Sequence, residues 1–459
     1  MLESNTVEAE LRHLIGTGAT GARLPSIREM ASRHRVSPVT VQHLISRLEH
    51  EGLVEPRPGR GTFVAGSPQL PPGDWNWQTV ALGARPVPGE GMVELLTDHP
   101  LDVVSLAMGY PDGSLQAVDL LSSAISRAAR RPGAWERSPA QGSPELRNWF
   151  AADIGGGVRA DDVVIVCGGQ AALSAAFRSL ASPGDAVVLE SPTYVGAIDA
   201  ARLAGLLPTP VPRDEQGIRA DLLDDALRAT RARLVYLQSF AANPTGASMS
   251  VARRRDVIEV ARANDAFIIE DDFVRDVYFG DPPPAPMLHH DRDGHVIYVR
   301  SLTKSAAPSL RIAAMVARGP ALRRLRNARL VDDFFVSTVM QEAALIAVTS
   351  TGWPRHLRRL RRAVSSRIDA VVDAVNGEAD LRLTSRPVGG FVVWVAIDDH
   401  LDDRAAAVAA RHEGVAVTPG SLSFCSEPPG SFLRLSVAGA DEAQIREGVR
   451  RLGAALSTM

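Results

Sequence analysis

The side-chain amines of this chain are the first residues to consider, because there is only one. Of the 50 basic residues, 49 are arginine and one is Lys304. An arginine-favouring coding bias explains most of this imbalance. Under such a bias, a lysine that only has to be positive can be replaced by arginine, so the remaining lysine is a candidate for chemistry that a guanidinium cannot perform. A primary amine can lose its proton and attack a carbonyl, whereas a guanidinium stays protonated.

The residues around Lys304 suit such chemistry. The lysine lies in Ser301-Leu-Thr-Lys-Ser305, directly after the apolar run Val296 to Val299, which we predict to be a buried strand. Arg311 follows seven residues later. A lysine on a loop at the end of a strand, with hydroxyls and an arginine nearby, indicates an imine to an aldehyde cofactor whose phosphate is anchored close by.

Three further stretches offer complementary chemistry at the ends of predicted strands. In Val163-Val-Ile-Val-Cys-Gly-Gly-Gln-Ala-Ala172, small residues at a helix start let backbone N–H groups approach a phosphate. In Asn243-Pro-Thr-Gly246, a side-chain amide can donate to a phenolate oxygen. In Phe267-Ile-Ile-Glu-Asp-Asp272, a carboxylate can keep a pyridine nitrogen protonated, which makes the ring an electron sink. Each stretch alone is also an ordinary turn, and the residues themselves do not choose between Asp271 and Asp272.

The amino-terminal residues predict a helix-turn-helix. Ser26-Ile-Arg-Glu29 is a capping box, and Ser37-Pro38 is an N-cap followed by proline at the first helical position. Only about three residues, 34–36, remain for the turn. The apolar residues of the second helix recur at helical spacing, so one face is buried and the polar face is free. The buried positions are Val41, Leu44, Ile45 and Leu48, and the outward positions are Thr40, Gln42, His43 and Arg47.

A β-hairpin is predicted directly after this second helix, which we expect to stop at Gly52. The run Leu53-Val-Glu-Pro-Arg-Pro-Gly-Arg-Gly-Thr-Phe-Val64 reads as two strands around a Pro58-Gly59 turn. Such a hairpin would be the wing of a winged helix, and Arg57 and Arg60 at its tip could reach phosphates or a minor groove. The alternative is a winged helix used for protein contacts.

The remaining chain alternates short apolar runs with amphipathic segments, which predicts an α/β fold with a largely parallel sheet. We place a DNA-binding domain at residues 1–65, a Pro/Gly-rich linker at 66–91 and an effector domain at 92–459, whose small α+β lobe starts near Asp332. The linker's Trp75 and Trp77 suggest that part of it docks on a surface. The predicted strands of the large lobe are Val163 to Val166, Ala186 to Leu189, Leu234 to Leu237, Ala266 to Ile269, Val296 to Val299 and Ile312 to Val316.

Composition excludes several classes of protein. The net charge is -3, which argues against a wholly basic chromatin or ribosomal protein. Two cysteines provide neither a disulfide framework nor a metal cluster, so we predict no metal. We find no signal peptide and no apolar run approaching the ~20 residues of a membrane span, and therefore expect a cytoplasmic protein without a membrane partner.

One arginine-rich stretch, Arg355 to Arg367, competes for a DNA-binding role. Its apolar residues, Leu357, Leu360, Val364, Ile368 and Val371, are spaced for one buried helix face. We therefore expect the arginines to form the solvated side of a helix, with a DNA-backbone contact as the alternative.

The amino-terminal motifs resemble the winged helix of the GntR family of bacterial regulators. The resemblance rests on Leu24-Pro-Ser-Ile-Arg28, Val36-Ser-Pro-Val-Thr-Val41 and Gly59-Arg-Gly-Thr-Phe-Val64, in that order. It implies binding to a double-stranded DNA operator, with Arg28 and Arg47 mainly on phosphates and Thr40 on a base. The other implied DNA contacts are Ser37, Arg60 and Gly61.

From about Val104 to the end, the motifs resemble the fold-type I aminotransferases that use pyridoxal 5'-phosphate (PLP). The resemblance implies that Lys304 is the Schiff-base lysine, Asp271 the partner of the pyridine nitrogen, and Asn243 the ligand of the ring oxygen O3'. It assigns Tyr194, in Ser191-Pro-Thr-Tyr194, to stacking on the ring, and Arg434, in Phe432-Leu-Arg-Leu-Ser436, to the α-carboxylate of an amino acid. The implied phosphate ligands are Gly169, Gln170, Ala171, Ser301, Thr303 and Arg311.

The combination of the two domains resembles the MocR subfamily of transcriptional regulators. It implies a homodimeric, PLP-dependent regulator that senses PLP or a small amino compound through aldimine exchange at Lys304. The alternatives are an active aminotransferase with an accessory winged helix, and a structural relic without cofactor. Two departures stand out: Phe273 where the subfamily usually has tyrosine, and Arg137 where aminotransferases usually have a tyrosine that reaches the neighbouring subunit's phosphate.

Overall fold

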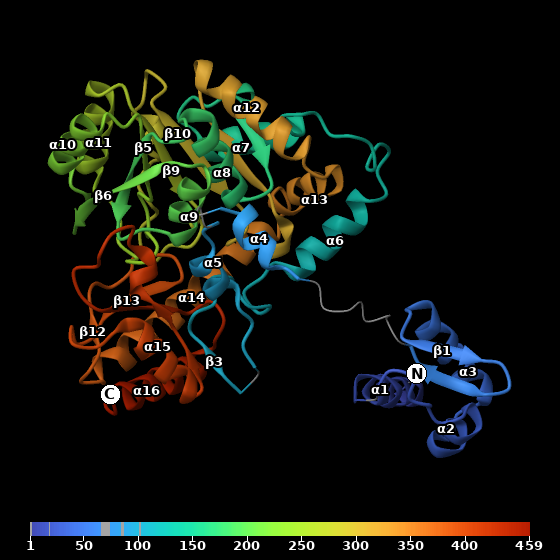
Figure 1. Ribbon diagram of the computed structural model, residues 1–459. Helices are drawn as coiled ribbons and strands as arrows, with labels where there is room; N and C mark the ends of the chain where they lie inside the picture. Colours follow the sequence, from blue (N-terminus) through green and yellow to red (C-terminus); the bar gives the residue numbers. More distant parts are fainter. Residues whose placement is uncertain (1, 18, 66–73, 84–86, 101) are drawn as a thin grey trace. The chain divides into compact units, whose positions relative to one another are not determined.

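The structure is a computed structural model that describes residues 2–17, 19–65, 74–83, 87–100 and 102–459. The chain divides into two compact units, Met1–Pro86 and Val87–Met459 (Figure 1). The division falls inside the predicted linker, of which 66–73 and 84–86 lie outside the described residues. In the described part of this linker, the helix α4 (Asn76–Ala81) was not predicted; Trp75 is its N-cap residue, Trp77 lies within it, and both side chains are exposed.

The first unit contains the predicted helix-turn-helix and wing. Its elements are α1 (Leu2–Thr17), α2 (Ile27–His34), α3 (Pro38–His50), β1 (Val54–Arg57), β2 (Gly61–Val64) and α4. The capping box between Ser26 and Glu29 is present, and Ser37 caps α3. The four predicted apolar positions of α3 are buried, and β1 pairs with β2 in antiparallel register. Val7 and Leu11 of α1 complete this small core.

An eight-stranded sheet forms the large lobe of the second unit. Its strand order is β4-β11-β10-β9-β8-β5-β6-β7, and the pairs from β10 to β6 are parallel. The strands are β4 (Val163–Val166), β5 (Ala186–Ser191), β6 (Leu207–Asp214), β7 (Gly217–Ile218), β8 (Leu234–Leu237), β9 (Phe267–Asp272), β10 (Val296–Ser301) and β11 (Ala313–Val316). All six predicted strands are therefore confirmed, with bounds that differ by at most three residues.

Helices cover both faces of this sheet, because alternate residues of each strand point to opposite sides. Val163 and Ile165 of β4 join one core cluster, while Val164 and Val166 join the other. The first cluster includes residues of α6 (Val118–Ala128), α7 (Pro144–Ile154), α10 (Ala220–Thr230), α11 (Val251–Ala263) and α13 (Thr338–Val348). The second includes residues of α8 (Gly169–Leu180), α9 (Val195–Leu203) and α12 (Gly319–Asp333).

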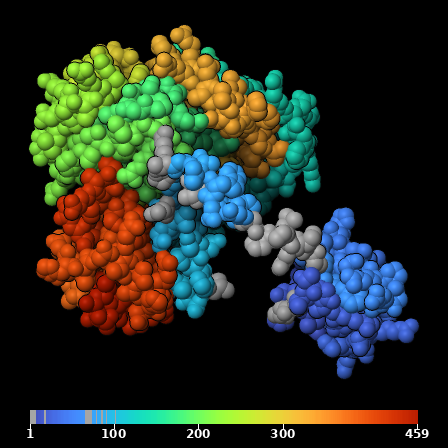
Figure 2. Space-filling model, viewed as in Figure 1, coloured from blue at the N-terminus to red at the C-terminus, as the bar shows by residue number. Residues whose placement is uncertain are grey.

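The small lobe packs directly against the large one, and its part from α14 to the C-terminus is drawn in dark orange to red in Figure 2. Its main sheet has the order β12-β13-β16-β15, and β3 (Val104–Ser105), from the start of the unit, pairs with β14. The helix α5 (Glu90–Leu96) precedes β3. The lobe contains α14 (Trp353–Asn376), β12 (Arg382–Leu383), β13 (Val392–Ala396), α15 (Asp403–His412), β14 (Val415–Ala416), β15 (Thr418–Pro419), β16 (Phe432–Ser436) and α16 (Glu442–Leu456). Short 3-10 turns lie at Ala160–Asp162, Met287–His289, Pro308–Leu310 and Gly420–Ser423.

The strand β6 was not predicted, because three prolines interrupt it. Pro208, Pro210 and Pro212 alternate along the strand, which pairs with β5 over 207–212. Alternate residues of a strand direct their N–H groups to opposite sides, so prolines at every second position leave the other amides free for the ladder with β5. The amide of Leu207 donates to Asp185 O at 2.9 Å.

The prediction that the arginines of 355–367 form a solvated face was wrong for Arg367. This side chain is buried in α14 and donates to Asp112 Oδ2 at 2.7 Å and to Val437 O at 3.1 Å. Arg361 is half-buried above the ring of Tyr278, with 3.9 Å between Cζ and the ring centroid. The spacing of apolar residues located the buried face but could not show that long arginines reach into it. No helix in the described part of the chain is long and apolar enough to cross a membrane.

We expect Arg367→Met to lower the free energy of unfolding of the second unit by about 2–3 kcal/mol, because Asp112 and two carbonyls would lose their buried donor. Urea unfolding of the full-length chain would measure the change. Arg362→Met is the matched control, because Arg362 lies on the exposed face of the same helix and its loss should change stability by less than about 0.5 kcal/mol. Equal stability of both variants would contradict the structural role of Arg367.

Candidate functional site

A cavity of about 900 Å³, including its mouth to solvent, lies in the second unit. It opens where β9 and β10 end and α8 begins, with α5 and the small-lobe strands β13 and β16 contributing the remaining walls. Ligands of open α/β sheets bind beyond the carboxyl ends of the strands, as this cavity does. The predicted residues that line it are Gly169, Gln170, Tyr194, Asn243, Asp271, Ser301, Thr303, Lys304, Arg311 and Arg434. Ala171 lies in the first turn of α8 and does not line it.

Lys304 is partly buried within this cavity. Its Nζ donates to the carbonyl of Gly109 and lies 3.8 Å from the centroid of the Tyr110 ring. Burial and, to a smaller extent, the cations Arg434 and Arg311 together lower the pKa of Lys304 to about 7, while Asp271 opposes the shift. A much larger fraction of this amine is therefore neutral near pH 7 than of an exposed lysine, so Lys304 is available as a nucleophile.

Asp271 is fixed by two neighbouring strands. Tyr236 Oη and Gln238 Nε2 each donate to its Oδ2 at 2.9 Å. Its Oδ1 is buried and has no hydrogen-bond partner within the described residues. Burial raises the pKa of Asp271 to about 6, although the bonds from Gln238 and Tyr236 favour the charged form. At neutral pH the group is thus mainly a carboxylate with one oxygen free to accept.

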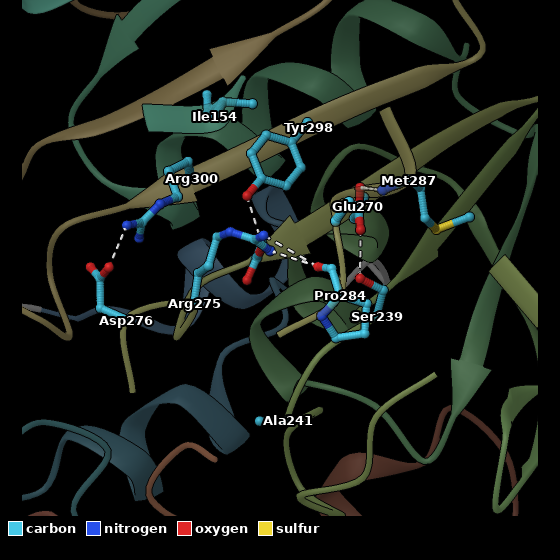
Figure 3. Close-up of polar contacts among 12 residues, drawn as sticks. Ile154, Ser239, Ala241, Glu270, Arg275, Asp276, Pro284, Met287, Tyr298 and Arg300 are labelled. Carbon is cyan, nitrogen blue, oxygen red and sulfur yellow. Dashed lines mark hydrogen bonds and ion pairs between the residues drawn. The ribbon is translucent and has the colours of Figure 1, made fainter. Parts of the chain in front are cut away.

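Glu270 and Asp272, the acidic neighbours of Asp271, point to the other face of the sheet, as alternation along a strand requires. Figure 3 shows Glu270 with its partners Ser239 and Met287. Glu270 accepts from Ser239 Oγ at 2.5 Å and from the amide of Met287 at 2.8 Å. Asp272 accepts from Tyr298 Oη at 2.7 Å and pairs with Arg275 at 2.9 Å. Of the three, Asp271 alone lines the cavity.

The start of α8 and the loop after β10 form one end of the cavity. Gly168 precedes α8 with φ +88°, and a Cβ built there would lie 2.7 Å from Arg311 Nη2. The same Nη2 donates to Cys167 O at 2.7 Å, so Arg311 packs against the backbone at the helix start. Thr303 Oγ1 is buried without a hydrogen-bond partner among the described residues. Backbone amides, a guanidinium and a free hydroxyl together favour a phosphate.

Arg434 lies at the other end and is only 4% exposed. Its Nε donates to Asn243 Oδ1 at 2.9 Å, and its Nη1 donates to Ala107 O and Thr418 Oγ1. Burial lowers the pKa of Arg434 to about 10. No carboxylate of the described residues forms an ion pair with it, so a buried cation faces the cavity without an anion. Because Asn243 accepts through its oxygen, its amide NH₂ remains a donor.

Tyr194 and Gln170 close a side wall. Tyr194 Oη donates to Gln170 Oε1 at 3.2 Å, and Gln170 Nε2 donates to Gly196 O at 2.8 Å. Burial raises the pKa of Tyr194, so the phenol stays neutral. Phe273 lines the cavity as well, whereas Arg137 is exposed and is not part of its lining.

Sequence reasoning did not find several residues of this site. Gln238 connects Asp271 to Asn243. Its Nε2 donates to Asp271, and its Oε1 accepts from the backbone N–H of Asn243 at 2.8 Å. Gly109 and Tyr110 contact Lys304 from a segment almost 200 residues earlier in the chain. No local pattern distinguishes these residues, and only the folded sheet brings them to the lysine. The helix α5 was also missed, although Met92, Leu95 and Leu96 line the cavity.

The predicted DNA contacts lie on the surface of the first unit, but two of them are already bonded to one another. Ser37 Oγ accepts from the amide of Thr40 at 3.1 Å, and the two hydroxyls are 2.8 Å apart. Arg47 is half-exposed and pairs with Glu8 of α1. The remaining predicted contacts, Arg28, Arg60 and Gly61, are exposed. Gly61 has φ +109°, and a Cβ there would lie 2.9 Å from Arg23 Nε, which accounts for glycine in the wing.

Comparison with known proteins identifies both parts of the chain. Residues 102–452 match the family "Aminotransferase class I and II", and residues 3–64 match "Bacterial regulatory proteins, gntR family". The chain therefore belongs to the class I and II aminotransferase family and carries a GntR-type helix-turn-helix domain, which is the organisation of MocR-type regulators.

The similar proteins include both aminotransferases and transcriptional regulators. A 2-aminoadipate transaminase of Thermus thermophilus is 32% identical over 84% of this chain and 98% of its own length. The probable rhizopine catabolism regulatory protein MocR of Rhizobium meliloti is 29% identical over 96% of this chain and 91% of its own. Among solved structures, LysN, the α-aminoadipate aminotransferase of Thermus thermophilus complexed with N-(5'-phosphopyridoxyl)-L-leucine, matches with a TM-score of 0.76 at 32% identity. That match covers 81% of this chain and 95% of LysN.

We expect Lys304 to react with an amine-specific reagent with a midpoint near pH 7 instead of near the ordinary lysine value of about 10.4, because burial disfavours its charged form. Labelling at a series of pH values, followed by peptide mapping, would separate it from the chain's α-amino group. Asp271→Asn removes the carboxylate that raises the pKa, so its midpoint should move to lower pH. A midpoint near that of free lysine would contradict the geometry described above.

Proposed function

We propose that this GntR-type regulator binds PLP covalently through Lys304 and responds to PLP and to a small amino compound by changing its affinity for a DNA operator. One observation carries the proposal: Asp271 Oδ1 and Thr303 Oγ1, two buried polar atoms of the cavity lining, lack partners among the described residues, in the same cavity as the chain's only lysine. Buried polar atoms without partners are rare, and a ligand with complementary groups would satisfy them.

The donor set of the cavity fits PLP. When bound, PLP supplies an aldehyde carbon that amines join reversibly and a ring that withdraws electrons. Lys304 would hold the aldehyde, Asp271 Oδ1 the pyridine nitrogen and the Asn243 amide the ring oxygen. Gly169, Gln170, Ala171, Ser301, Thr303 and Arg311 would surround the phosphate, and Tyr194 would cover one side of the ring. Phe273 has no hydroxyl, so the ring oxygen would have one donor fewer than with tyrosine.

Arg434 would bind the carboxylate of the amino compound. A buried guanidinium without an anion is unfavourable, and a carboxylate offers it a charge-assisted pair. Its three bonds to Asn243, Thr418 and Ala107 use Nε and Nη1 and hold the guanidinium in place.

The helix α5 offers a route from the cavity to the DNA-binding unit. Met92, Leu95 and Leu96 line the cavity, and α5 is the first helix of the second unit along the chain. A ligand that contacts these side chains favours one position of α5 over others, and so biases the start of the connection to the first unit. The affinity for the operator would change with the position of α5. The operator would be contacted through Arg28, Ser37, Thr40, Arg47, Arg60 and Gly61.

We expect PLP to change the dissociation constant for the operator by at least about fivefold, the lower end of typical coupling between two sites. Footprinting on the protein's own upstream region, with and without PLP, would measure it. Lys304→Ala should bind DNA as the unloaded protein does and lose the response to PLP. Arg60→Ala, at the tip of the wing, should weaken DNA binding in both conditions and leave the response intact.

An active aminotransferase is the competing function, because the cavity holds the groups for turnover as well as for sensing. Many cycles of transamination per chain, together with a DNA affinity that neither PLP nor amines change, would replace the proposal. Absence of absorbance near the visible edge from PLP bound to the wild-type protein would instead indicate a relic without cofactor. Borohydride reduction and peptide mapping would locate the adduct, since Lys304 is the only side-chain amine.

The regulator would act as a homodimer, and the second unit carries an apolar surface that a second copy could cover. Trp135, Val331 and Phe334 are 81%, 83% and 73% exposed. Thr338 Oγ1 donates to Glu136 O at 2.8 Å, which brings the segment after α12 next to Trp135. Exposed apolar side chains that gather in this way mark interaction surfaces. Two copies would present two winged helices to repeated or inverted half-sites.

We expect Trp135→Glu combined with Phe334→Glu to weaken self-association at least tenfold, because two buried charges would replace two apolar side chains at the interface. Sedimentation velocity over a concentration series would measure it. Leu207→Glu is the control, because Leu207 is also exposed, at 60%, but lies on β6 near the other edge of the sheet. A monomeric wild-type protein at micromolar concentration would rule the dimer out.

A further inference from the structure

We propose that the amino compound sensed in this cavity is an α-amino acid with an apolar side chain. This inference rests on the proposed function and adds the chemical class of the effector. The inference excludes dicarboxylic amino acids and amines without a carboxylate as effectors. Both of these classes also carry an amine that can join PLP. The argument uses the charges and the apolar walls of the cavity.

The cavity has one cation available for the effector. Its charged lining residues are Asp271, Lys304, Arg311 and Arg434. In the proposed function the ring nitrogen engages Asp271 and the phosphate engages Arg311. Lys304 holds the aldehyde until the effector's amine displaces it, and its lowered pKa then lets it stay neutral, so Arg434 alone remains as a persistent cation. A compound with one carboxylate satisfies this buried guanidinium. A second carboxylate would be desolvated beside it without any partner from the lining, which is unfavourable.

The charged residues of the cavity lining also argue against amines without a carboxylate. Such a compound would leave Arg434 buried without an anion, as it is in the protein alone. A second ammonium group, as in a polyamine, would find no carboxylate in the lining other than Asp271, which the ring nitrogen needs. The charged residues of the cavity lining therefore determine which class of amino compound binds.

An apolar wall faces this set of charges. Met92, Leu95 and Leu96 come from α5, and Phe391 and Val392 come from the small lobe. Leu96 is 53% exposed, so part of this wall is available to an apolar ligand. Each methylene that a ligand buries there should tighten binding roughly fourfold. The helix α5 carries no arginine or lysine between Glu90 and Leu96 that could hold a second carboxylate.

The α5 part of this wall has contacts on both sides. Glu94, on the outer side of α5, pairs with Arg411 of α15 at 2.5 Å. Gly91 packs so closely on α9 that an added Cβ would lie 2.3 Å from Val195 Cγ2. Tyr194 Oη lies 3.8 Å from Met92 Sδ. These contacts place the apolar side chains of α5 against the cavity, in the position that an apolar ligand would favour over others.

Titration of the full-length, PLP-loaded protein with three matched compounds tests the inference. L-Leucine has a carboxylate and an apolar side chain, L-2-aminoadipate has a second carboxylate, and 3-methylbutylamine is leucine without its carboxylate. The readouts are the absorbance of bound PLP and the affinity for the operator. L-Leucine should act at concentrations at least tenfold lower than either of the others.

A charge introduced into the wall should reverse the selectivity. In Leu95→Arg, L-2-aminoadipate should become the stronger ligand, because a second cation now faces the cavity. Val93→Arg is the matched control, since Val93 lies on the same helix, is 67% exposed and does not line the cavity. It should keep the preference for leucine. Thermal unfolding would show that both variants are folded, and the comparison of the three compounds on the wild type stands without either variant.

Two results would overturn the inference. An equal or stronger response of the wild type to L-2-aminoadipate or to 3-methylbutylamine would exclude the apolar amino-acid class, while PLP binding and the proposed function would stand. Absence of bound PLP, or a DNA affinity that PLP and all three compounds leave unchanged, would overturn the proposed function together with the effector class.

Discussion

Three consecutive buried carboxylates at the end of β9 impose the constraint on which the rest of the site depends. A carboxylate removed from water needs hydrogen bonds or a cation, and Glu270, Asp271 and Asp272 are each at most 3% exposed. Because successive residues of a strand face opposite sides, the first and the third share one layer of partners. Ser239, Met287, Tyr298 and Arg275 supply that layer through fixed bonds. Asp271 faces the other side, where its Oδ1 is left to the cavity.

The charges of the cavity follow from this arrangement. Its lining holds three cations and one carboxylate, so the cavity is electrostatically incomplete without anions. The neighbouring cations Arg434 and Arg311, together with burial, lower the pKa of Lys304 to about 7. A phosphate beside Arg311 and a carboxylate beside Arg434 would restore the balance from outside the protein. The excess of positive charge that helps to lower the pKa of Lys304 therefore also favours anionic ligands.

Sequence patterns predicted those parts of the protein that are determined locally. Capping residues and helical spacing located α2 and α3, and apolar runs located six of the eight strands of the large sheet. The prolines of β6 conceal a strand whose hydrogen bonds use only every second amide. Arg367 shows the opposite error, because a charged residue type does not reveal that its guanidinium meets Asp112 and two carbonyls in the interior.

The site itself was predictable only where each residue lies within a motif. Asp271 lies near the end of β9, while Lys304, Asn243 and Gly169 follow β10, β8 and β4. These strands end at the same edge of the sheet, which brings such residues together. Gln238, Tyr236 and Tyr110 have no motif, and their contribution depends on strand order and on the packing of a segment from near the start of the unit. Their contacts hold Asp271 and Lys304 in position, and strand order is not written in any single stretch of sequence.

The structure gives the arginine bias of the chain a physical meaning. Arginine is accepted at buried positions that have a fixed anion: Arg254 lies 3.5 Å from Glu270, and Arg300 lies 2.8 Å from Asp276. Position 304 has the opposite surroundings, with Arg434 and Arg311 among its neighbours and a single carboxylate to offset them. A guanidinium there would keep its charge, since even burial leaves the pKa of Arg434 in the same cavity at about 10, whereas an amine can release its proton and become neutral. Arginine therefore suits buried positions where the positive charge persists, and lysine remains at position 304, where the charge has to be lost.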